Sequence, residues 1–72
     1  MPISAETLLA VGMILMKDDD MSLYEIVYGS NGVWYFREGE KNQNGAWVFP
    51  KNKTAVSEPF EVLRWQYSIW RQ

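Results

Sequence analysis

The chain has no cysteine and no histidine among its 72 residues. Without cysteine it forms no disulfide bonds, and without either residue type a zinc or other transition-metal site is not expected. The same absences remove the side chains that most often act as general bases and thiol nucleophiles, so we expect no enzyme activity, no cofactor and no metal. The five glycines match neither GxGxxG nor GxxxxGK[ST], and are interpreted as turn residues.

Long apolar runs are also missing. The run from Leu8 to Met16 is far shorter than the roughly 20 residues that cross a bilayer, and it lacks the flanks of a signal peptide. A small secreted domain without disulfides is unusual, so we expect a cytoplasmic protein with no membrane association.

The length of 72 residues predicts one small β domain, spanning residues 1–72. A domain of this size is marginally stable without a staple, so a large aromatic core, an oligomer or both are needed. Four Trp, four Tyr and three Phe meet that requirement, because aromatic side chains bury large areas.

The clearest structural signal lies in Leu23 to Glu38, LYEIVYGSNGVWYFRE. Asn31-Gly32 supplies the two positive-φ residues of a type I′ turn, and β-forming residues flank it, so a β-hairpin is predicted. Side chains alternate along each strand. One predicted face carries Tyr24, Ile26, Tyr28, Val33, Tyr35 and Arg37. The other carries Leu23, Glu25, Val27, Trp34, Phe36 and Glu38.

Both faces of this hairpin are apolar, whereas antiparallel sheets commonly have one polar face. We assign the face with Tyr24 and Ile26 to the core, because the opposite face holds glutamates, which are rarely buried without a partner. Trp34 and Phe36 are then predicted to face outward. The domain's own core covers one face, so the other is expected to meet a curled-over neighbouring segment, a partner chain or a ligand.

A short helical turn is predicted within residues 1–11, with Ser4 as its N-cap. Ile3, Leu8 and Leu9 are expected to plug one end of a barrel. Further strands are recognised from β-forming runs between turn signals. With the hairpin included, the predicted strands lie near residues 12–17, 22–29, 32–38, 45–50 and 60–70.

The last of these runs is ambiguous. Alternation from Leu63 to Trp70 fits a strand, whereas Phe60, Leu63, Tyr67 and Trp70 also form one helical stripe with Ser57 as N-cap. We favour the strand because Trp, Tyr and Ile cluster there.

The predicted fold class is mainly β: a small SH3-like antiparallel barrel or curled sheet of four to five strands with a short N-terminal helical turn. An open sheet completed by a dimer mate and a terminal helix on a four-stranded sheet are the alternatives.

Charge is distributed unevenly along the chain. Residues 1–36 carry five acidic and one basic side chain, a net −4, whereas residues 37–72 carry six basic and four acidic, a net +2. We interpret most of these charges as solvated loop residues, although such asymmetry also orients partners. Asp18, Asp19 and Asp20 lack the spacing of an EF-hand loop and are interpreted as a solvated turn.

An outward aromatic face usually marks an interaction site. We therefore expect a non-enzymatic protein-binding module, in the manner of a small phage-type or accessory modulator of a larger protein, which also forms a homodimer. The predicted partner-binding residues are Val27, Trp34, Phe36, Arg64 and Trp70. Trp47 and Trp65 are expected to lie in the core.

Single-stranded nucleic-acid binding is the alternative function, because aromatic and basic residues interleave in the second half of the chain. The overall acidity of the chain argues against it, since phosphate binding needs an excess of positive charge. The residues that this alternative would use are Trp34, Phe36, Arg37, Lys51, Lys53, Arg64 and Trp70.

Overall fold

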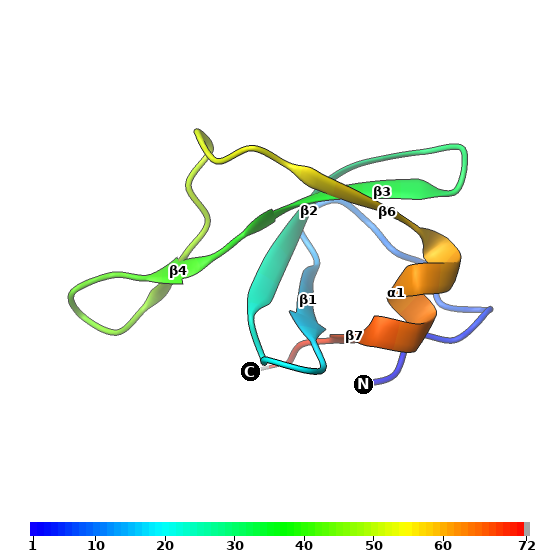
Figure 1. Cartoon of the computed structure of the whole chain (residues 1–72), viewed down its shortest axis with the longest axis horizontal. Helices are drawn as coiled ribbons and strands as arrows, with labels where there is room; N and C mark the ends of the chain where they lie inside the picture. Colours follow the sequence, from blue (N-terminus) through cyan, green and yellow to red (C-terminus); the bar gives the residue numbers. More distant parts are fainter. Residues whose placement is uncertain (72) are drawn as a thin grey trace.

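A computed structural model describes residues 1–71 as a strongly curled antiparallel sheet of five strands, in the order β6-β3-β2-β1-β7, with one short helix (Figure 1). This half-barrel confirms the predicted fold class of a small barrel or curled sheet. Its strands are β1 (Ile14–Lys17), β2 (Leu23–Ser30), β3 (Val33–Glu38), β6 (Val56–Pro59) and β7 (Tyr67–Ile69), and the helix is α1 (Phe60–Gln66). A separate two-stranded hairpin consists of β4 (Glu40–Lys41) and β5 (Trp47–Val48).

The central hairpin forms where the sequence predicts it. Asn31 and Gly32 both have positive φ angles, 54° and 77°, as a type I′ turn requires, and Ser30 pairs with Val33 on either side of them. Asn and Gly adopt this conformation at low cost, which is why the turn is specified locally.

The faces of the hairpin differ from the prediction because β2 contains a β-bulge. Ile26 pairs with Phe36 but Tyr28 pairs with Tyr35, so Val27 is an extra residue in β2. An extra residue breaks the strict alternation of side chains, and every position beyond it changes face relative to the partner strand.

The assignment of Trp34 and Phe36 to the outward face is therefore wrong. Phe36 has no exposed surface, and Trp34 is half-buried against the core cluster. Ile26 is in the core as predicted, whereas Tyr28 and Tyr35 face outward. The bulge thus preserves the predicted faces in the first half of β2 and inverts them on β3.

The core fills the concave side of the sheet. Tyr24, Phe36 and Tyr67 make three aromatic contacts, with ring centroids 5.2, 5.7 and 5.4 Å apart, in edge-to-face and tilted arrangements that favour aromatic pairing. Burial raises the pKa of the Tyr67 hydroxyl to about 12. The buried cluster consists of Ile3, Leu15, Ile26, Phe36, Leu63, Tyr67 and Ile69.

The prediction of a strand over 60–70 is correct only for its end. Residues Phe60–Gln66 form α1, and the strand β7 covers Tyr67–Ile69. Pro59 occupies the extended position before the helix, where a missing N–H is tolerated. Leu63 is fully buried, so α1 packs against the core where it connects β6 to β7 (Figure 1).

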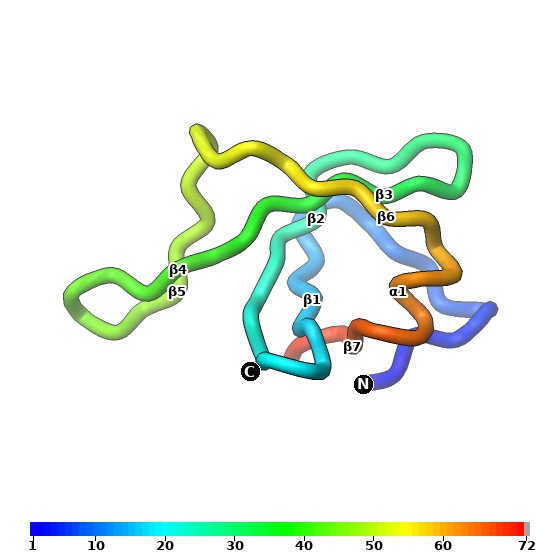
Figure 2. Tube along the Cα trace, viewed as in Figure 1, coloured from blue at the N-terminus to red at the C-terminus, as the bar shows by residue number. Residues whose placement is uncertain are grey.

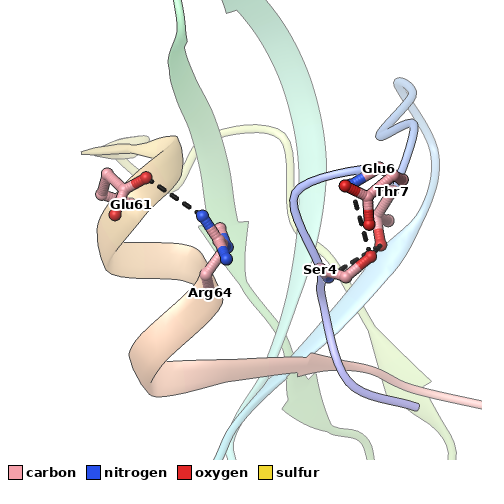
Figure 3. Close-up of polar contacts among 5 residues, drawn as sticks. All are labelled: Ser4, Glu6, Thr7, Glu61 and Arg64. Atoms are coloured by element: carbon pink, nitrogen blue, oxygen red, sulfur yellow. Dashed lines mark hydrogen bonds and ion pairs between the residues drawn. The ribbon is translucent and has the colours of Figure 1, made fainter.

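Within residues 1–13 the chain forms turns, where a short helical turn was predicted. The amide of Thr7 donates to the Ser4 carbonyl at 3.1 Å, and the amide of Ser4 donates to Thr7 Oγ1 at 2.9 Å (Figure 3). Ile3 plugs the core as expected and Leu9 packs against it, but Leu8 is 89% exposed.

The outer edge of β7 is covered by the start of the chain. The Met1 amino group donates to the Ile69 carbonyl at 2.9 Å, and the Ile69 amide donates to the Met1 carbonyl at 2.7 Å. Pro2 forms an isolated bridge with Ser68. These contacts satisfy one edge of the five-stranded sheet.

The β4–β5 hairpin projects from the body on the side away from α1 (Figure 2). Its loop turns at Gly45, whose φ is 80°, and Asn42 Oδ1 accepts hydrogen bonds from the amides of Asn44 and Ala46. The predicted strand over 45–50 is reduced to Trp47–Val48. Lys53 and Glu40 form an ion pair of 3.3 Å at the base of the arm.

The run of three aspartates forms a turn, as predicted. Ser22 donates to Asp20 Oδ1 through its hydroxyl at 2.6 Å and its amide at 3.0 Å. These hydrogen bonds lower the pKa of Asp20, because they stabilise its charged form.

Candidate interaction surface

The outward side of the β2–β3 hairpin carries two exposed tyrosines. Tyr28 and Tyr35 lie directly opposite each other in the ladder, with ring centroids 5.6 Å apart and an angle of 47° between the rings. Their exposed fractions are 57% and 37%. Cross-strand aromatic pairs of this kind stabilise a sheet, and here they also leave apolar surface open to solvent.

The strand β6 lies next to this tyrosine pair and forms an edge of the sheet. Ser57 pairs with Tyr35, so the small Ser57 side chain stands on the same outward side and leaves the tyrosine ring uncovered toward the edge. Ser57 and Val56 are both exposed.

The main-chain groups of β6 divide between the two sides of the strand. The amide of Phe60 donates to the Gly32 carbonyl at 2.9 Å, which sets the hydrogen-bonding phase of the ladder with β3. Because the main-chain groups of successive residues alternate in direction in an antiparallel pair, the N–H and C=O groups of Glu58 and Val56 are directed at β3. The N–H and C=O of Ser57 and the C=O of Pro59 are therefore directed at the open edge.

One basic residue completes this surface. Arg37 follows Tyr35 on the same side of β3, and its Nε donates to the Lys53 carbonyl at 3.0 Å. That bond holds the guanidinium toward the segment that leads into β6. We call the set Tyr28, Tyr35, Arg37 and Ser57 the edge surface.

The residues predicted to bind a partner do not come together on one face. Phe36 is enclosed, Trp34 packs on the concave side, and Val27 is half-buried in the bulge. Arg64 lies on α1, where its Nη1 contacts Glu61 Oε1 at 3.2 Å (Figure 3). Trp70 is half-buried, and its amide donates to the Ile14 carbonyl at 2.9 Å.

The two tryptophans expected in the core lie elsewhere. Trp65 is 79% exposed, because it occupies a position of α1 that points away from Leu63. That expectation assumed a strand, in which Trp65 would share a face with Leu63. Trp47 is half-buried on the projecting arm, with Lys41 Nζ 5.6 Å from its ring centroid.

The positions of these residues also weaken the case for single-stranded nucleic-acid binding, the alternative function. Phe36 has no exposed face on which a base could stack. Lys53 and Arg64 are each engaged by a glutamate, Glu40 and Glu61. The charge left for phosphate contacts is correspondingly small.

Sequence reasoning missed Tyr28 and Tyr35 as surface residues, because it assigned both to the core. Gly29 was the available signal, because a glycine inside a strand often marks a bulge or a close approach. The ring of Trp34 covers Gly29, so a side chain at Gly29 would collide with it.

Residues 1–71 contain no group of three or more acidic side chains arranged to hold a metal ion. In the same range no helix is long and apolar enough to cross a membrane. Comparison with protein-family models, curated proteins and solved structures finds no match for the chain.

Proposed function

We propose that the chain is a non-enzymatic protein-binding module that receives an extended segment of another protein at the open edge of β6. The observation that carries the proposal is the position of this edge beside the exposed Tyr28–Tyr35 pair. In strand addition, main-chain hydrogen bonds supply affinity and neighbouring side chains supply specificity. The edge surface offers both elements together.

The two edges of the sheet are not equivalent. Residues Met1 and Pro2 cover β7, whereas no strand among residues 1–71 pairs with the outer side of β6. Proteins protect exposed edges with proline, and Pro59 removes one donor from β6. Ser57 keeps both of its main-chain groups, so the edge admits a short segment centred on that residue.

A cytoplasmic location belongs to this proposal. A domain of 72 residues without cysteine lacks the disulfides that small extracellular domains commonly use. An accessory role, in which the module modulates a larger protein, is consistent with its small size.

The test uses a displayed library of short random peptides selected on the purified chain. We expect the selected peptides to slow hydrogen exchange at the Ser57 amide, because that N–H becomes bonded in the complex. Ser57→Pro removes this outward donor and adds a ring that obstructs the added strand, so it should weaken binding about tenfold or more.

Ser57→Ala is the matched control, because it shortens the side chain and retains the amide; its binding should equal that of the wild type. Equal binding by Ser57→Pro would refute the edge as the site. Sedimentation equilibrium separates self-association from binding to another protein. A wild-type dimer that becomes monomeric in Ser57→Pro would identify a second copy of the chain as the occupant.

A further inference from the structure

We infer that the segment received by β6 runs antiparallel to it and carries an apolar side chain followed, two residues later, by a carboxylate. This inference rests on the proposed function and adds the direction and chemistry of the partner. It is carried by the arrangement of Tyr35, Arg37 and Ser57 along the edge.

The spacing of Tyr35 and Arg37 matches the spacing of alternate side chains in an extended chain. Tyr35 and Arg37 are two residues apart on β3 and lie on its outward side. Alternate residues of a strand are roughly 6.6–6.8 Å apart, so two alternate side chains of an added strand meet these two residues in turn. Ser57, between Tyr35 and the open edge, is too small to block the first contact.

The guanidinium of Arg37 is oriented for the second contact. Its Nε is fixed by the Lys53 carbonyl, 16 residues away, which draws the group toward the edge. The ion pairs among residues 1–71 are Lys53–Glu40 and Arg64–Glu61, so Arg37 forms no ion pair in that range, although Glu25 lies opposite it in the β2–β3 ladder. A partner carboxylate gives the remaining guanidinium N–H groups charge-assisted hydrogen bonds.

The charges around the two ends of β6 also favour a carboxylate on the side of Arg37. Residues 37–55 contain four basic and two acidic side chains, a net +2, and they flank the Val56 end of β6. Residues 56–66 contain two acidic and one basic side chain, a net −1, and they include the Pro59 end. A partner carboxylate is therefore favoured at the Val56 end.

Strand direction follows from these positions. The sheet is antiparallel throughout, and antiparallel pairing is slightly the more stable per residue. In an antiparallel addition, the residues of the partner that approach Val56 are the later ones in its sequence. The apolar residue beside Tyr35 therefore precedes the carboxylate beside Arg37.

The experiment compares four blocked, threonine-rich peptides that differ at two alternate positions: Phe then Glu, Phe then Gln, Phe then Lys, and Glu then Phe. Binding to the wild-type chain is measured by fluorescence anisotropy, with hydrogen exchange at Ser57 as the readout of position. We expect the first peptide to bind about fivefold more tightly than the Gln peptide, with the Lys peptide weakest. The reversed peptide should match the Gln peptide at best.

Variants of the chain assign the preference to one side chain. In Arg37→Gln the preference for Glu over Gln should disappear. Lys41→Gln removes the same charge from the projecting arm, where Lys41 lies over the Trp47 ring, and should retain most of the preference. Should Arg37→Gln fail to fold, the Glu-to-Lys change in the peptide tests the same contact on the wild-type protein.

The outcomes separate the two proposals. Peptides that protect Ser57 without discriminating Glu, Gln and Lys would overturn the carboxylate inference and leave the binding function standing. Tighter binding of the reversed peptide would overturn the antiparallel direction. If no peptide in the series and none from the random library protects Ser57, the proposed function itself is wrong.

Discussion

Gly29→Ala offers a sharp test of the bulged register, because its effect on stability should change sign with the residue at position 34. Gly29 pairs with Trp34, and a Cβ built on Gly29 lies closer than 3.0 Å to three carbons of the indole ring. Gly29 is absent from the glycines with positive φ, which are Gly12, Gly32 and Gly45, so alanine suits its backbone. The three atoms nearest to the added Cβ all belong to the ring, so the ring is the main obstacle to the substitution.

The magnitude follows from two opposing terms. Overpacking costs about 1–3 kcal/mol, while replacing glycine by alanine stabilises by about 0.4–1 kcal/mol through the unfolded chain. Gly29→Ala alone should therefore reduce the free energy of unfolding by about 0.5–2 kcal/mol. With Trp34→Val already present, the ring is gone, and the same change should increase the free energy of unfolding by about 0.4–1 kcal/mol.

The assay is urea denaturation of the wild type, both single variants and the double variant. Trp34→Val removes core contacts, so all four proteins are measured in the same concentration of a stabilising osmolyte. The coupling energy of the cycle isolates the contact between the ring and position 29. An equal loss of stability from Gly29→Ala in both backgrounds would show that the ring does not cover Gly29, and the bulge at Val27 would be misplaced.

Two further predictions concern a buried side chain, Tyr67, and an exposed one, Trp65. Burial raises the pKa of Tyr67 from 10.0 to about 12, so the folded state favours the neutral hydroxyl. The contribution of this effect to the free energy of unfolding is complete below pH 10 and is lost as the pH rises through 12. Urea unfolding at pH 10 and pH 12 should show that Tyr67→Phe loses about 2 kcal/mol less stability over this range than the wild type. Trp65→Ser should change the free energy of unfolding by about 0.5 kcal/mol or less in thermal denaturation, because the side chain is 79% exposed. A loss of several kcal/mol would place Trp65 in the core after all.

The sequence contains enough local information for the hairpin and its turn but not for its faces. Asn31-Gly32 determines the turn through backbone conformations that few other residue pairs adopt. The inward or outward orientation of Phe36 depends on how many residues of β2 oppose each residue of β3. The extra residue in β2 is determined by packing, in which Trp34 lies over Gly29. The alternation of apolar and polar residues along the sequence does not reveal a bulge.

The region from Phe60 to Ile69 shows a different kind of limit. Its local pattern fits both a helix and a strand, and the structure contains one after the other. Tyr67–Ile69 becomes a strand because it pairs with β1, which lies near the other end of the chain. Contacts so distant in sequence override weak local propensities, and no local pattern reveals them.

The helix also explains why the sheet has an open edge. Seven helical residues span about 10 Å, roughly twice the spacing of paired strands, so β6 and β7 are held apart by α1. Had residues 60–66 continued as a strand, β6 and β7 would be parts of one continuous strand instead of the two separate edge strands of the sheet. The region that the sequence assigns to a strand is thus the element that separates the two edge strands of the sheet.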